Sequence, residues 1–454
     1  MADMHTKDLT TGSPMKLILS FMLPLVFGLL FQQVYSMVDT IVVGKFLGVD
    51  ALAGVGSTGS ITFLVLGLCN GVCAGFAIPV AQKFGQRDFD GLRRFVGNMI
   101  WLSCVIAAAA TLVTTLLCRQ ILLWMDTPAD TFSYAYDYIF VIFLGIPATM
   151  LYNLLSGILR SLGDSKTPLV FLIMCSLLNV ALDIVFILTL NMGVAGAGWA
   201  TLLSQLISGV LCLYFIVKKF PILHLKQDDL RLRKIYVRKL LNMGLPMGLQ
   251  FSITAIGTIM LQSAMAAIAA GSRVSMLLVC PFDAMGTTAA TFAGQNLGAG
   301  KLDRIHQGVK DCTVLGIIIS AAIFVITWFG GSAMTTLFLD TADGASVDMV
   351  VPMGQQFLLI NAAFAIPLLF VNLLRFTIQG LGYSEFAVFA GVFEMVARGA
   401  FGLCLVPVLG YTAACFASPA AWVMADLFLF PAYFHCMKKQ GYSFKPTKAS
   451  AATE

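Results

Sequence analysis

The sequence predicts an all-α polytopic membrane protein in which twelve transmembrane helices form two pseudo-symmetric six-helix lobes. The composition, the spacing of long apolar runs and an internal repeat lead to this fold class. Of the 454 residues, 59% are hydrophobic and only 11% are charged, whereas soluble domains carry about 25% charged residues. The chain is therefore solvated mainly by lipid, and its small net charge of +5 does not indicate a nucleic-acid partner.

Twelve apolar runs reach the length of about 20 residues that a helix needs to cross a bilayer. In lipid the backbone must satisfy its own hydrogen bonds, so we expect each run to be a helix. The runs fall near residues 15–43, 52–81, 95–117, 131–157, 167–190, 194–217, 238–264, 275–297, 309–331, 350–375, 384–408 and 412–436. Prolines inside these runs predict that several helices are bent or broken. They are Pro24, Pro79, Pro147, Pro246, Pro281, Pro367 and Pro407.

Short motifs recur in the two halves of the chain. Gln82-x-x-Gly85 returns as Gln295-x-x-Gly298, and Leu162-Gly163 returns as Leu381-Gly382. A polar linker at 218–237 separates the copies, which predicts an N-terminal lobe at 1–217, a C-terminal lobe at 238–440 and a polar tail at 441–454. Because six spans is an even number, the copies have the same topology and pair about an axis along the membrane normal, an arrangement suited to alternating access.

The lysines and arginines predict the orientation. Most of the 28 fall in the linker, the termini and the connections on the same side. The positive-inside rule places that side in the cytoplasm. We therefore expect a multi-pass protein of the plasma (inner) membrane with both termini cytoplasmic.

Polar groups inside the N-terminal spans are the main candidates for function. A charged side chain at the centre of a bilayer costs at least about 2.5–3.5 kcal/mol, so Asp39 and Asp183 are functional candidates by default. At a rise of about 1.5 Å per residue, Asp39, Asp183 and Thr201 share one level, roughly 9–12 Å from the outer ends of their spans. Tyr35 and Asn179 lie one turn below the two acids. Two carboxylates, an amide oxygen and a hydroxyl predict a Na⁺ site at Asp39, Asn179, Asp183 and Thr201, or a coupled proton pair.

The C-terminal half lacks copies of these acids. It has other buried polar groups, of which Glu394 and Arg398 are one turn apart and most simply pair with each other. Asp283 and Asp426 are single acids, suited either to helix–helix hydrogen bonding or to a transport pathway. Asn153 has a counterpart in the repeat, which favours a role in packing. The candidates for a substrate cavity are Tyr35, Asn153, Asp283 and Glu394.

The motifs resemble those of the MATE family of multidrug and toxic-compound extrusion transporters over the whole chain. The marks are Met22-Leu23-Pro24 with Asp39 downstream, Gln82-Lys83-Phe84-Gly85-Gln86, Asn179-x-x-x-Asp183, Gly193-x-x-Gly196-Ala197 and Gln295-x-x-Gly298. The acids of the N-terminal lobe resemble the DinF-like branch, and the length resembles MepA-like exporters. The resemblance implies that Asp39, Asn179, Asp183 and Thr201 form the cation or proton site and that the first helix bends at Pro24. The seventh span lacks the acid on which the NorM-like branch relies.

The resemblance implies a secondary exporter of cationic or amphipathic drugs, driven by inward H⁺ or Na⁺, with no cofactor. No G-x-x-x-x-G-K-[ST] motif is present to couple ATP hydrolysis. A lipid-linked precursor flippase is the alternative, but its phosphates favour several intramembrane Arg or Lys, and we expect only Arg398. We do not expect an enzyme, because neither Asp39 nor Asp183 has the glycine motifs of intramembrane proteases. A two-lobed chain forms its own path, so we expect a functional monomer in the lipid bilayer.

Overall fold

A computed structural model describes residues 6–262, 266–336 and 344–444, and this part of the chain is helical with no strand. The α-helices of the first half are α1 (Pro14–Leu47), α2 (Val49–Ser57), α3 (Gly59–Gly85), α4 (Phe89–Trp124), α5 (Phe132–Leu144), α6 (Ile146–Ser161), α7 (Lys166–Ile184) and α8 (Gly193–Lys219). Those of the second half are α9 (Lys234–Gln262), α10 (Ala266–Gly298), α11 (Leu302–Thr336), α12 (Gly344–Ala363), α13 (Ala365–Gly380), α14 (Ser384–Ala400), α15 (Val406–Leu409) and α16 (Tyr411–Lys439).

The helices account for the predicted spans. Among the described residues, nine helices are long and apolar enough to cross a membrane. Two further spans are bent pairs, in which α5 meets α6 at 46° and α12 meets α13 at 53°. The predicted span at 238–264 coincides with the 29-residue α9, which is not among these eleven. The prediction of a polytopic all-α membrane protein is confirmed.

The prolines bend only some of these helices. Pro147 and Pro367 follow the breaks within the two bent pairs, where proline is tolerated because the first turn of a helix needs no N–H partner. By contrast, α1, α3, α9 and α10 run without a break through Pro24, Pro79, Pro246 and Pro281. The α1 helix is therefore continuous at Pro24 in this conformation.

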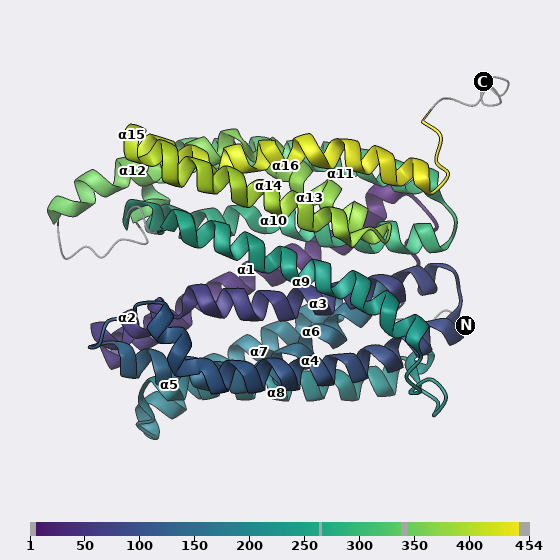
Figure 1. Cartoon of the computed structure of the whole chain (residues 1–454), viewed down its shortest axis with the longest axis horizontal. Coiled ribbons are helices and arrows are strands. Elements are labelled where there is room, and N and C mark those ends of the chain that lie inside the picture. Colours follow the sequence, from purple (N-terminus) through teal and green to yellow (C-terminus); the bar gives the residue numbers. More distant parts are fainter. Residues whose placement is uncertain (1–5, 263–265, 337–343, 445–454) are drawn as a thin grey trace.

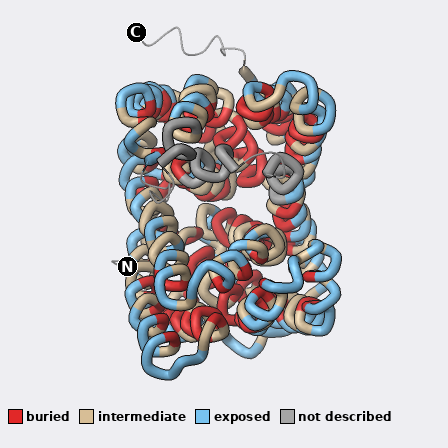
Figure 2. Tube along the Cα trace, turned by 90° about the vertical axis from the view of Figure 1, so that its left-hand side faces the viewer, coloured by how far each residue is buried: buried red, intermediate tan, exposed pale blue. Residues whose placement is uncertain are grey.

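The bundle has two halves with separate cores (Figures 1 and 2). Buried residues of α3, α4, α6 and α8 form one core, and those of α10, α13 and α16 form the other. The start of α1 packs into the second core through Phe21 and Met22, whereas its end packs against α8 through Val42 and Val43. Likewise, α9 packs against α3 of the first half and α14 of the second. Thus α1 and α9 run between the halves and contact both. The domain boundaries stay a prediction.

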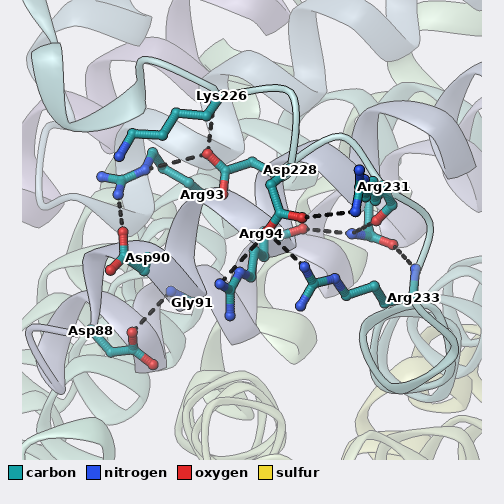
Figure 3. A network of polar contacts seen from close by, with 11 residues as sticks. Asp88, Asp90, Gly91, Arg93, Arg94, Lys226, Asp228, Arg231 and Arg233 are labelled. Atoms are coloured by element: carbon teal, nitrogen blue, oxygen red, sulfur yellow. Dashed lines mark hydrogen bonds and ion pairs between the residues drawn. The ribbon is translucent and has the colours of Figure 1, made fainter.

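The linker between the halves is fixed to the first turns of α4 (Figure 3). Asp229 lies 3.5 Å from Nε of Arg93, and Asp228 lies 3.7 Å from Nη2 of Arg94. Asn98 accepts from the backbone N–H of Arg233 at 3.0 Å. Gly97 permits this approach, because a Cβ there would lie 2.1 Å from the Asp229 carbonyl oxygen. The linker thus sets the position at which α9 begins.

Candidate functional site

The predicted polar pair lies on α7, where Asn179 and Asp183 are both buried. Their spacing of four residues places them on one face of the helix. One residue after Asp183, the α-helix gives way to a π-helical turn at Val185–Thr189. Such turns occur often at functional sites. The local backbone is therefore irregular directly beside the Asp183 carboxyl group.

The neighbouring helix α8 brings Thr201 to Asn179. When the amide nitrogen of Asn179 points toward Asp183, it donates to Asp183 Oδ2 at 3.3 Å. Its oxygen then accepts from the hydroxyl of Thr201 at 3.3 Å and from the backbone N–H of Thr201 at 3.2 Å. The orientation of an amide is assigned from such partners, and this orientation satisfies both ends. Asn179 therefore connects Thr201 to Asp183.

The second acid comes from α1. The side chains of Asp39 and Asp183 are in hydrogen-bonding contact, and Tyr35 and Tyr138 lie within electrostatic range of both. Within the described residues, the enclosed Oδ1 atoms of Asp39 and Asp183 have no protein donor. Ionised carboxylates are acceptors only, so two in contact need a proton or a cation between them.

The chemistry of this cluster is limited by its neutral surroundings. Over the described ranges, neither acid has a basic side chain as an ion-pair partner. The oxygens of Asp39, Asp183, Asn179 and Thr201 suit a hard cation such as Na⁺. Among the described residues, no three His, Cys, Asp or Glu side chains lie together so that they could hold a metal ion. The cluster can exchange a proton or a monovalent cation.

The buried charges of the second half are arranged differently. Glu394 contacts Arg375 on α13 and lies 3.3 Å from Nη2 of Arg398, its neighbour on α14. The predicted Glu394–Arg398 pair is present, but the expectation that Arg398 is the only intramembrane arginine is wrong. Arg375, at the end of a predicted span, is also buried. Glu394 is 2% exposed and sits between two cations, so its placement on a substrate cavity stays a prediction without an exposed surface to support it.

The two single acids of the second half both lie within electrostatic range of Arg375. Asp426 on α16 is buried, and its Oδ1 has no hydrogen-bond partner among the described residues. Asp283 is exposed although it lies in the middle of α10. A charged side chain in the middle of a membrane-spanning helix is disfavoured on the lipid-facing side, and Arg375 provides an opposite charge within electrostatic range. Asp283 therefore suits the cavity role predicted for it better than Glu394 does.

Asn153 and its counterpart in the repeat, Asn372, both bond within their own helices. Asn153 donates to the Thr149 carbonyl at 2.8 Å, and Asn372 donates to the Leu368 carbonyl at 3.4 Å. Each side-chain amide thus donates a hydrogen bond to the backbone carbonyl four residues earlier in its own helix. This arrangement supports the packing role that the repeat suggested.

The repeated Gln-x-x-Gly motifs join the two halves at the end of the bundle that holds both termini. Gln82 donates to the Gly380 carbonyl at 3.1 Å, and Gln295 donates to the Ser161 carbonyl at 2.8 Å. The glycines allow the backbones to meet. A Cβ at Gly85 would lie 1.9 Å from the Gln295 carbonyl oxygen, and one at Gly298 would lie 2.0 Å from that of Gln82. We call this reciprocal pair of contacts the glutamine exchange.

The segment before α1 crosses the same junction. Lys7 donates its backbone N–H to the Leu162 carbonyl at 3.0 Å in the first half. Leu9 donates to Oε1 of Gln295 at 2.9 Å, and Arg304 donates to the Gly12 carbonyl at 2.8 Å, both in the second half. Residues 7–12 thus bridge the halves beside the glutamine exchange.

Comparisons with known proteins agree with this architecture. The MatE family model matches residues 24–185 and 240–403, one match in each half and together more than half of the chain. This chain belongs to the MATE family. Because this is a family of transporters, the prediction that the chain is not an enzyme is confirmed.

Named relatives of this MATE chain cover most of its length. It is 28% identical over 395 residues to the "Probable multidrug resistance protein YpnP" of Bacillus subtilis (strain 168), covering 83% of this chain and 84% of that protein. It is 23% identical to the "Multidrug export protein MepA" of Staphylococcus saprophyticus subsp. saprophyticus, with coverages of 86% and 89%. A solved structure described as the "Outward-facing conformation of a multidrug resistance MATE family transporter" has a TM-score of 0.89 and 22% identity, covering 96% of this chain and 98% of that one.

Sequence reasoning missed Tyr138, Arg375 and the bridging segment 7–12. Tyr138 lies in a span whose register depends on the bend between α5 and α6. Arg375 stands at the edge of its apolar run, where arginine usually reaches the interface. The segment 7–12 is polar and has no periodic pattern, and its hydrogen bonds are to distant residues.

Proposed function

We propose that this MATE chain is a secondary active multidrug exporter that antiports cationic or amphipathic organic compounds against H⁺ or Na⁺ by alternating access. The observation that carries the proposal is the contact between Asp39 and Asp183 in surroundings without a basic partner. An acid pair of this kind has to be neutralised from outside the protein. The relatives named as multidrug resistance and export proteins support the class of substrate.

The proton accounts most directly for the contact between the two carboxyl groups. One shared proton turns one carboxyl into a donor and the other into its acceptor, and it removes half of the charge. Na⁺ would instead lie between the oxygens and draw on those of Asn179 and Thr201. In both cases Asn179 transmits the state of Asp183 to Thr201 on α8, because it is hydrogen-bonded to both.

The direction of access follows from the junction between the halves. The glutamine exchange closes the end of the bundle with the termini, which the distribution of Lys and Arg predicts to be cytoplasmic. We therefore propose that this conformation is an outward-facing state, in which the ion enters from outside. Binding at Asp39 on α1 would act on the same helix whose start packs in the second half. A bend of α1 at Pro24 would change that packing as the occupancy changes.

The two buried arginines do not favour a lipid-linked precursor flippase. Such a ligand carries phosphates, which need free guanidinium groups, whereas Arg375 and Arg398 both contact Glu394. Asp283, the exposed charge of this region, is negative and suits a cationic substrate.

Reconstitution tests the proposal. Liposomes containing the protein as a monomer would receive a pH gradient or a Na⁺ gradient separately, with transport of a fluorescent lipophilic cation as the readout. We expect uphill transport under one gradient and its loss in Asp39→Asn and Asp183→Asn. Asp126→Asn removes an exposed acid that lies outside the helices and is the matched control. Transport that survives both site substitutions would contradict coupling through these acids.

A further inference from the structure

A cavity of about 540 Å³ opens at the end of the bundle that holds the termini. It lies between the first turns of α9 and the turn joining α13 to α14. Lys234, Arg238 and Lys239 line it, together with Asn242 and Met243 of the same helix. No lining residue is acidic. The three cations are exposed and have no acidic neighbour among the lining residues, so their positive potential attracts an anion.

The neighbouring acids are already engaged, so they do not supply that anion. Asp228 is within ion-pair distance of Arg94, Arg231 and Arg233, and Asp229 of Arg93. Figure 3 shows Asp228 directed toward Arg94 of α4 and toward the linker's own arginines. Among the described residues, Lys234, Arg238 and Lys239 form no ion pair. Lys239 instead stacks over the Phe95 ring at 5.7 Å.

An apolar stripe leads away from the cavity along α9. Leu245, Leu249 and Ile256 are exposed on this helix at 46%, 50% and 43%. Their spacing of four and seven residues continues the face of Arg238 and Asn242. The cations lie at the level where a membrane-spanning helix begins, and the stripe runs toward the bilayer centre. A free inorganic anion would use the cations and leave the stripe unused.

We propose that this cavity binds the phosphate headgroup of an anionic phospholipid, with an acyl chain along Leu245, Leu249 and Ile256. The cations match the negative surface of the leaflet that the positive-inside pattern assigns to this end. The site is independent of the acid pair of α1 and α7. The bound lipid touches both halves, because Gly382 of the second half closes the cavity near Gln82 of the glutamine exchange.

Native mass spectrometry of the delipidated, detergent-solubilised protein tests this site. The probes are dioleoyl phosphatidylglycerol, dioleoyl phosphatidylcholine, soluble glycerol 3-phosphate and inorganic phosphate. We expect wild type to bind phosphatidylglycerol in preference to phosphatidylcholine. The variant K234Q/R238Q/K239Q should bind phosphatidylglycerol at least about tenfold more weakly, since each basic group near a lipid surface contributes to the attraction.

A matched variant separates the cavity from the general charge of this face. K218Q/K219Q/K226Q removes three exposed lysines that do not line the cavity, and we expect its affinity to stay within about twofold of wild type. If the triple variant at the cavity fails to fold, Arg238→Gln alone should still weaken binding measurably. Equal binding of phosphatidylglycerol by wild type and both cavity variants would overturn the proposal. So would binding of glycerol 3-phosphate or phosphate as tight as that of the lipid.

Discussion

The two halves of this transporter have similar arrangements of helices, but their buried charged side chains have different partners. In the first half, Asp39 and Asp183 contact each other and neutral side chains only, within the described residues. In the second half, Glu394 lies between Arg375 and Arg398. Both α7 and α14 end in a π-helical turn, at Val185–Thr189 and Phe401–Leu405. The backbone irregularity is therefore common to both halves, while the contact between two acids occurs, among the described residues, in the first half.

This difference shows how a duplicated fold can separate two tasks. An acid pair without a permanent cation changes its net charge when an ion binds or leaves, so it can report occupancy. An acid held by two arginines keeps its charge, because the two adjacent positive charges favour the ionised carboxylate. We infer that the first half carries the coupling chemistry and that the second half supplies a fixed electrostatic frame beside Asp283.

The largest expected effect is on coupling. Asp183→Asn keeps the size of the side chain but removes the charge that an ion must neutralise. We expect gradient-driven transport to fall to the level of empty liposomes, while the purified protein stays monodisperse. Glu394→Gln is the comparison in the second half, and it should reduce stability without abolishing the dependence on the gradient. If Glu394→Gln abolished the dependence on the gradient and Asp183→Asn did not, the coupling site would lie in the second half.

The second prediction concerns the stability of the paired cluster. Arg375→Met removes one partner of a buried ion network, which typically costs about 3–5 kcal/mol. We expect a clear loss of thermal stability in detergent. Replacing the cluster as a whole, with R375M/E394M/R398M, should cost less than the single change, because Glu394 and Arg398 are then not left with an unbalanced charge. A single variant as stable as wild type would contradict the role of Glu394 as a shared partner.

The third prediction tests the feature in which the halves agree. Gly85→Ala would place a Cβ 1.9 Å from the Gln295 carbonyl oxygen, and Gly298→Ala would place one 2.0 Å from the Gln82 carbonyl oxygen. We expect both to weaken the closed junction by about 1–3 kcal/mol, the usual cost of overpacking. Distances between spin labels across the junction would show the opening. Gly56→Ala, which meets no atom within 4 Å, is the control, and unequal effects of the two glycines would argue against a symmetric contact.

The smallest effect is expected at the turns before α4 and α11. Asp88 caps α4 by accepting from the Gly91 N–H at 2.9 Å, whereas Lys301 stands before α11 and donates to the Thr10 carbonyl at 2.8 Å. The hydrogen bond from Lys83, followed by that from Gly91, lowers the pKa of Asp88. Its contribution is therefore present above its unfolded pKa, near 3.9, and is lost as the pH falls through the lower folded pKa.

The matching measurement is unfolding as a function of pH. Asp88→Ala should cost about 0.5–2 kcal/mol at neutral pH, and the difference from wild type should shrink below about pH 4. Lys301→Ala should show no such change in this range, since a lysine stays charged throughout it. A difference for Asp88→Ala that is constant from neutral to acid pH would contradict the capping role.

Sequence predicted the first site because helix geometry alone sets the depth of a residue. Counting from the span ends placed Asp39, Asp183 and Thr201 at one level, and Asn179 and Thr201 do meet. The partners of Glu394 were only half predictable. The spacing of four residues identifies Arg398 on the same helix, but Arg375 comes from α13, and no pattern within one helix specifies its neighbour.

The sequence shows the motifs of the glutamine exchange as a repeat, but it does not predict the contacts that they make. A recurring Gln-x-x-Gly motif says that two positions are equivalent, and it leaves open whether they touch. The same limit applies to residues 7–12, whose hydrogen bonds to Leu162 and Gln295 join positions far apart in the chain. Contacts of this kind depend on how the halves dock.

The glutamine exchange has the form of an isologous dimer interface, in which each copy offers the same group and receives it in return. Two identical half-length subunits could make it without any linker. The acid pair could not be shared in that way, since a symmetric dimer would carry it twice. Fusion into one chain allows a single acid pair to occur in a molecule whose junction both halves build equally. The loss of symmetry thus limits this pair to one copy per protein.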